Sequence, residues 1–121
     1  MYKVTISQFG PLGTTGEDKD KWRRLDITLE LDFIPQVGAY LEARYIDGLV
    51  KTVEHNLNYP KEPLHKVTLQ DKWSYDAFSS VIKWDNLPEN MTAGSIMVPH
   101  PEGGFTTQDG LDRWASRQDQ S

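Results

Sequence analysis

A strict two-residue alternation constrains this chain most. From Leu25 to Phe33, five apolar residues alternate with four polar ones. Successive side chains of a β-strand point to opposite faces, so this pattern puts the apolar residues on one face and the polar residues on the other. We predict a strand with one buried and one solvated face, which favours an antiparallel sheet. The outward carboxylates Asp26, Glu30 and Asp32 are typical of a solvated strand face.

Further strands are predicted on both sides of this segment. They are Lys3–Phe9, Ala39–Ile46, a segment that ends near Leu57, Leu64–Gln70 and a short one at Ser95–Val98. The pair Asp47-Gly48 lies between apolar residues and predicts a two-residue hairpin, which would set Tyr40 opposite His55. A longer turn centred on Pro60 would set His55 opposite His65. These turns are expected to fix the register of the sheet.

The period changes after Lys72. Tyr75, Phe78, Val81 and Ile82 recur at helical spacing behind a suitable N-cap, and they predict one helix over about 74–85. A strand through Phe78–Trp84 is the alternative interpretation, because the local sequence is not strongly helical. We expect an α+β fold that is mainly β: an antiparallel sheet of five to six strands, or a half-barrel, with this helix packed on it and a C-terminal tail.

Composition divides the chain near Pro99. Residues 1–98 are predicted to form a single β-rich domain, and residues 99–121 a polar tail that is poor in apolar side chains. Asp109 could cap a short helix over about 109–117 that presents Leu111, Trp114 and Ala115 on one side. A tryptophan in a polar tail either docks on its own chain or binds another one. A homodimer through the tail is therefore plausible.

Charge and composition exclude several classes of protein. The chain has 121 residues, no cysteine, and 18 acidic against 13 basic side chains, for a net charge of −5. It lacks an apolar run of roughly 20 residues, so we expect no membrane span, and its first ten residues do not resemble a secretion signal. We expect a cytoplasmic protein without disulfides. The acidic balance makes nucleic acid an improbable partner.

Two histidines are the strongest candidates in the sequence for metal binding or catalysis. If His55 and His65 are cross-strand neighbours, their imidazoles could share a divalent metal or supply a general base near neutral pH. The commoner role for such a pair is a hydrogen-bonded contact on a half-exposed hairpin. As an enzyme, the chain would use His55 and His65 together with Tyr40 and Glu42, which the predicted turns gather at one end of the sheet.

The leading functional hypothesis is a non-enzymatic protein-binding module of the immunity, inhibitor or adaptor type. It would act through an acidic surface that contains aromatic residues, with Trp114, Leu111 and Phe105 as contact residues. Small, acidic, cysteine-free chains of this type are frequent among phage and mobile-element products. We predict no cofactor, and another protein or a second copy of the chain as partner. The alternatives are a small-ligand or metal-assisted enzyme at the His55/His65 end, and a small barrel that binds single-stranded nucleic acid.

Overall fold

The computed structural model describes residues 1–12, 21–58, 63–71 and 83–119. These ranges contain eight β-strands and one α-helix, so the predicted class, α+β and mainly β, is confirmed. The strands are β1 (Tyr2–Pro11), β2 (Trp22–Leu31), β3 (Tyr40–Ala43), β4 (Ile46–Asn56), β5 (Leu64–Leu69), β6 (Met91–Ala93), β7 (Met97–Pro99) and β8 (Phe105–Thr107). The helix is α1 (Gln108–Asp119).

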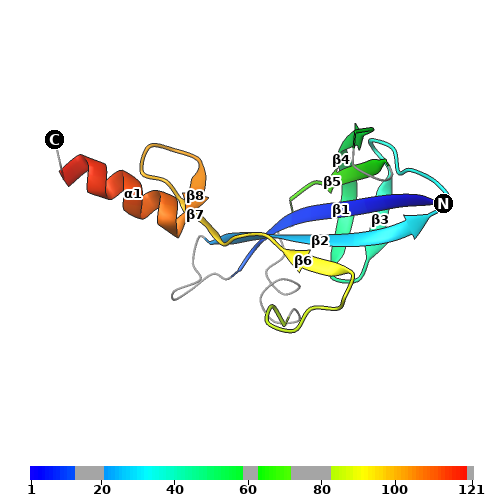
Figure 1. The fold of residues 1–121 in the computed structure, drawn as a ribbon, viewed down its shortest axis with the longest axis horizontal. Coiled ribbons are helices and arrows are strands. Elements are labelled where there is room, and N and C mark those ends of the chain that lie inside the picture. Colours follow the sequence, from blue (N-terminus) through cyan, green and yellow to red (C-terminus); the bar gives the residue numbers. More distant parts are fainter. Residues whose placement is uncertain (13–20, 59–62, 72–82, 120–121) are drawn as a thin grey trace.

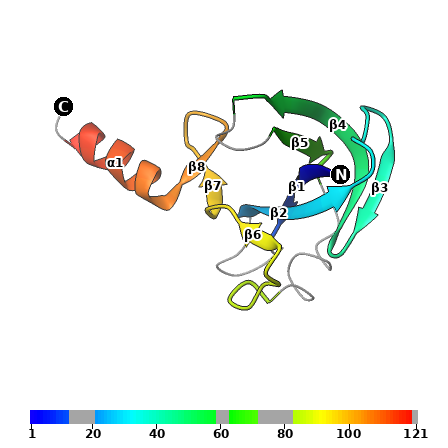
Figure 2. The same cartoon turned by 45° about the vertical axis from the view of Figure 1, so that its right-hand side comes forward.

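The strands form one open, curled sheet (Figure 2). Their order is β3-β4-β5-β1-β2-β7-β8, and β6 pairs with β2 outside this path. The pairs are antiparallel except that between β1 and β5, which is parallel. The sheet is therefore mostly antiparallel, as predicted, with one parallel pair that local sequence patterns do not indicate.

The alternating segment lies on β2 as far as Leu31, and Leu25 and Ile27 are buried as predicted, whereas Phe33 follows the strand and is 54 % exposed. Val4 pairs with Leu29 and Ile6 with Ile27 across the β1–β2 ladder, so their apolar side chains gather on one face. The core cluster is almost fully buried and draws on β1, β2, β4, β5 and β6: Val4, Ile6, Leu25, Ile27, Ile46, Val50, Val67, Leu69 and Met91. Burial of this size is the main source of folding free energy.

The turn between β3 and β4 differs from the prediction. The hairpin turns at Arg44 and Tyr45, so that Tyr40 pairs with Leu49 and not with His55. Tyr45 takes a φ of 73°, which is uncommon for a residue other than glycine. Gly48 serves inside the strand instead, with a φ of 154°. Asp47-Gly48 therefore does not form the predicted turn. Gly48 lies inside β4, where close packing needs a residue without a side chain.

That packing need comes from Gln8. A Cβ added to Gly48 would lie 3.2 Å from Gln8 Nε2. The Gln8 amide is 1 % exposed and donates to the carbonyls of Asp47 (2.7 Å) and Gln70 (2.8 Å), while its oxygen accepts from Asp47 N–H. Gln8 thereby joins β1 to the start of β4 and the end of β5. A buried amide with every bond satisfied pins the curled sheet at this end.

The β4–β5 pairing confirms the second register prediction. His55 lies opposite His65 and Glu54 opposite Lys66. The register shifts between Val50 and Thr52 through a bulge, which lets Val50 remain buried at the start of the strand.

The helix and the last strand that the sequence predicts differ from the structure where it describes them. Most of the helix predicted over about 74–85 lies outside the described residues, and the end that is described, residues 83–85, is not helical. The strand predicted at Ser95–Val98 occurs two residues later, as β7. The sequence pattern did not indicate β6, whose three residues pair with Leu25–Ile27 of β2.

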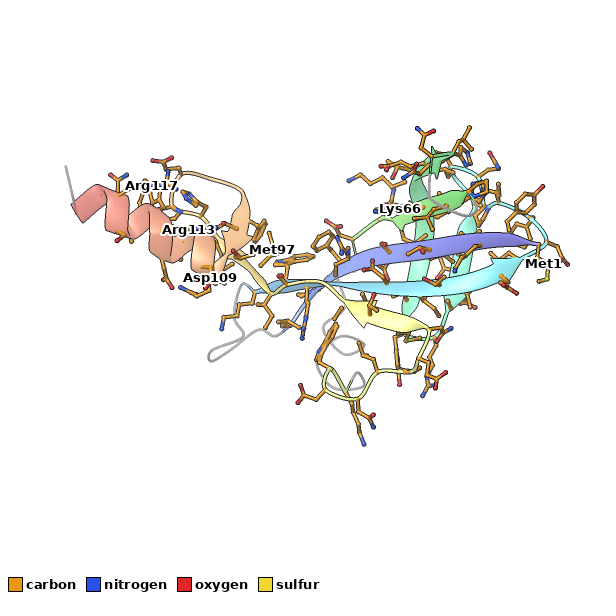
Figure 3. All side chains as sticks on the ribbon, viewed as in Figure 1. Met1, Lys66, Met97, Asp109, Arg113 and Arg117 are labelled. Carbon is orange, nitrogen blue, oxygen red and sulfur yellow. The ribbon has the colours of Figure 1, made fainter. Side chains whose placement is uncertain are left out.

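The molecule has two parts that differ in shape. Strands β1 to β6 form the body, and residues 97–119, which comprise β7, β8 and α1, form the arm (Figure 1). The arm joins the body where Trp22 of β2 pairs with Met97 of β7. Figure 3 shows Met97 at this junction, Arg113 and Arg117 on the projecting helix, and Met1 at the opposite end of the molecule.

Candidate functional site

An apolar pocket lies where the arm meets the body. It has a volume of about 410 Å³ and is lined by Phe9, Trp22, Asp71, Met97 and Phe105. Among the described residues, three aromatic residues, one methionine and one aspartate therefore line the pocket. Concave sites with apolar walls and few polar groups are the usual form of a binding pocket.

Strand alternation places the body's aromatic walls on the outer face of the sheet. On β1, Val4 and Ile6 point to the core, so Phe9 shares the opposite face with Thr5 and Ser7. Trp22 shares the outer face of β2 with Arg24 in the same way. Aromatic rings on a face that is otherwise polar need cover from another element, and the arm supplies part of it.

Phe105 covers these rings only in part. Its ring contacts Trp22 at a centroid distance of 6.2 Å, in a tilted arrangement, yet the side chain is 53 % exposed. Of the predicted protein-binding residues, Phe105 is the one that lines the pocket. The contact to Trp22 fixes the ring at the pocket's edge and leaves much of its surface available.

The arm holds its helix through local contacts. Thr107 Oγ1 accepts a hydrogen bond from Gly110 N–H at 3.1 Å, so Thr107 is the N-cap, two residues before the predicted Asp109. Trp114 stacks edge-on against His100 at 5.1 Å, and its Nε1–H donates to Glu102 at 3.3 Å. Trp114 therefore docks on the loop between β7 and β8. Leu111 is half-buried one turn earlier on the helix.

The histidine pair forms a second candidate site, at the far end of β4 and β5. The Nδ1 atoms of His55 and His65 lie 2.8 Å apart, and the ring of Tyr2 meets His65 edge-on at 5.6 Å. His65 is buried, at 7 % exposure, while His55 is exposed. Glu54 and Lys66 flank the pair in sequence and point to the opposite face, as alternation requires.

The other two residues of the enzymatic hypothesis are not brought to this pair. Tyr40 and Glu42 lie on β3 and pair with Leu49 and Asp47. The Tyr40 hydroxyl donates to Asp47 Oδ2 at 2.9 Å, and this hydrogen bond to a carboxylate raises the pKa of Tyr40 above its ordinary value. A tyrosine held protonated in this way is a poor proton acceptor near neutral pH.

Sequence reasoning missed four of the five described residues that line the pocket. A signal existed for Phe9 and Trp22, because the two-residue period that buries Val4 and Leu25 puts both aromatics on the polar face. No local signal could find Asp71 or Met97, which reach the pocket only through the packing of the arm against the body. Within the described ranges, no three His, Asp or Glu residues are grouped so as to hold a metal.

Comparison with known proteins adds no relative. No protein-family model matches the chain, and neither the curated proteins nor the solved structures give a significant match. In the part of the chain that the structure describes, no helix is both long enough and apolar enough to cross a membrane.

Proposed function

We propose that this chain is a protein-binding module that holds a segment of another protein in the pocket between body and arm. The observation that carries the proposal is the composition of the pocket walls: Phe9, Trp22, Met97 and Phe105, together with Asp71. Such a pocket suits an apolar side chain that is followed or preceded by a lysine or arginine, whose charge would pair with Asp71.

The arm supports this role because its helix has little to hold it. α1 is 12 residues long, and within the described residues it packs on β8 and on the loop before it. Isolated helices of this length are marginal in water. A helix that leaves most of its surface to solvent, beside an apolar pocket, is suited to gain its remaining contacts from a partner.

Charge favours a basic partner segment. The chain carries a net charge of −5, and residues 97–119 contain four acidic and two basic side chains. A net negative charge raises the rate of encounter with a basic segment and disfavours acidic ones. Trp114 and Leu111, the other predicted contact residues, would line the approach along α1, and Phe105 would form the anchor.

The experiment selects peptides from a random displayed library on the full chain. We expect the selected peptides to combine a large apolar residue with a neighbouring Lys or Arg. Phe105→Ser should abolish their binding, and Asp71→Lys should remove the preference for a basic neighbour. The matched control is Phe33→Ser, because Phe33 is 54 % exposed, against 53 % for Phe105, but lies outside the pocket.

Two results would speak against this function. Equal peptide binding by the Phe105→Ser and Phe33→Ser variants would show that the pocket is not the site. A second copy of the chain is the other occupant to consider, and light scattering after size-exclusion chromatography detects it. A dimer that Phe105→Ser converts to a monomer would assign the pocket to self-association instead.

A further inference from the structure

We propose that His55 and His65 form a two-nitrogen site for a divalent late transition metal ion, and that Cu(II) is the ion it binds most tightly. This site lies on β4 and β5 and is independent of the pocket at the arm. The register of the β4–β5 pair sets the two residues directly opposite each other on one face of the sheet. Opposed residues on antiparallel strands have Cβ atoms close enough for both side chains to reach one ion.

The donor atoms are already close enough to bind one ion. The two Nδ1 atoms are 2.8 Å apart. Two nitrogens bound at about 2.0 Å in adjacent square-planar positions lie about 2.8 Å apart, whereas a tetrahedral angle would separate them by about 3.3 Å. Cu(II) and Ni(II) prefer the square-planar or tetragonal arrangement, and Cu(II) binds most tightly in the divalent series.

The same spacing accounts for the metal-free chain. One Nδ1 donates its hydrogen to the other, and this hydrogen bond joins the two rings. A metal ion would take the place of that proton, because a histidine ligand binds through an unprotonated nitrogen. The rings need only turn their lone pairs toward a common point, without a change in the strand register.

The surroundings suit an ion that enters from solvent. His65 is fixed by burial and by the edge contact with Tyr2, so one ligand is held in place. His55 is exposed and leaves the outer coordination positions to water. Since Lys66 points to the other face, its charge does not oppose the ion at close range. A site with two protein ligands is expected to be reversible and not structural.

The test titrates the full chain, without a histidine tag, with Cu(II) and with Zn(II) by calorimetry. We expect one Cu(II) per chain, with weaker binding of Zn(II). His55→Ala should weaken Cu(II) binding by more than about tenfold, because even the loss of a residue that only supports a ligand costs 10- to 100-fold. The matched control, His100→Ala, removes the third histidine, which contacts Trp114 on the arm, and should leave the affinity unchanged.

Electron paramagnetic resonance gives a second measurement, which reports how many imidazole nitrogens bind the Cu(II) ion. The Cu(II) spectrum of the full chain should show splitting from two imidazole nitrogens, and that of His55→Ala from one. His55 is exposed, so this variant should fold normally, which circular dichroism verifies. Cu(II) affinity that His55→Ala leaves intact, a spectrum with a single imidazole, or equal affinity for Zn(II) and Cu(II) would each overturn the proposal.

Discussion

The body and the arm are built by different means. In the body, β1 pairs with β2 on one edge and β5 on the other, and the core residues of these strands are nearly inaccessible. In the arm, two strands of three residues carry a helix, and Val98 is the one described residue of the arm that is buried. Burial holds the body together, whereas local hydrogen bonds and one stacked tryptophan hold the arm.

This difference separates the residues that stabilise the fold from those that line the pocket. Residues that stabilise the body point inward, and the pocket takes Phe9 and Trp22 from its outer face. The arm can therefore vary its contacts at little cost to the body, since regions with few buried apolar contacts open at low free energy.

The strongest test removes core volume from the body. Leu25 is fully buried between β1 and β6, so Leu25→Ala should lower the free energy of unfolding by about 2–5 kcal/mol, as large-to-small core substitutions do. Chemical denaturation followed by tryptophan fluorescence measures the change. Total stabilities of roughly 5–15 kcal/mol make this a severe loss.

The arm supplies the matched control. Leu111→Ala makes the same chemical change at a half-buried position on α1 and should cost less than about 1 kcal/mol, because little apolar surface is lost. Similar losses from Leu25→Ala and Leu111→Ala would show that the arm shares the core of the body and would refute the separation.

The second test removes the buried amide that closes the body. Gln8→Leu has nearly the same size but leaves the carbonyls of Asp47 and Gln70 without their donor. Buried groups left unpaired cost about 1–3 kcal/mol, so the free energy of unfolding should fall by about 2–3 kcal/mol. Gln36→Leu is the control, because Gln36 is exposed and its bond to Ile34 is local; it should change stability by less than about 0.5 kcal/mol.

Gln8 also explains how far the sequence could predict the fold. Alternation identified β1 and β2, and the residues around Pro60 gave the register of β4 and β5, because both depend on neighbours along the chain or across one turn. The turn at Tyr45 could not be predicted in the same way. Gly48 is needed for the close approach of Gln8, a contact across 40 residues that no local pattern carries.

The candidate sites divide along the same line. The histidine pair followed from the turn register, whereas Tyr40 and Glu42 were assigned to it through the misplaced turn. For the pocket, strand alternation already placed Phe9 and Trp22 on the face of the sheet opposite the core. The missing information was that β7 returns to pair with Trp22, a long-range contact that brings Met97 and Phe105 beside them.

The third test separates the helix from its hairpin. An alanine normally stabilises a helix over glycine by about 1 kcal/mol. At Gly110 a Cβ would collide with the Thr106 hydroxyl, so Gly110→Ala should instead weaken the packing of α1 on β8 by about 1 kcal/mol. Hydrogen exchange should show faster amide exchange in α1 and unchanged exchange in β1 and β2.

A double variant verifies the cause of that effect. Thr106→Ala removes the colliding hydroxyl, so Gly110→Ala with Thr106→Ala should regain the protection of α1 and show the helix gain that alanine usually brings. If the double variant exchanges as fast as the single one, the helix is lost for a reason other than the collision, and Gly110 does not set the distance between α1 and β8.

The smallest effect is expected from removing most of the arm. A chain that ends at Val98 loses β8 and α1, whose described contact with the body is mainly that of Phe105 with Trp22. The free energy of unfolding of its body should lie within about 1 kcal/mol of that of the full chain, because this contact is exposed and the core is left complete. Denaturation of both chains measures it, and light scattering shows whether the arm holds an oligomer together. A loss of several kcal/mol with no change in mass would mean that the arm is part of the folded body. The contacts of the arm would then be needed for folding and would not be available to a partner.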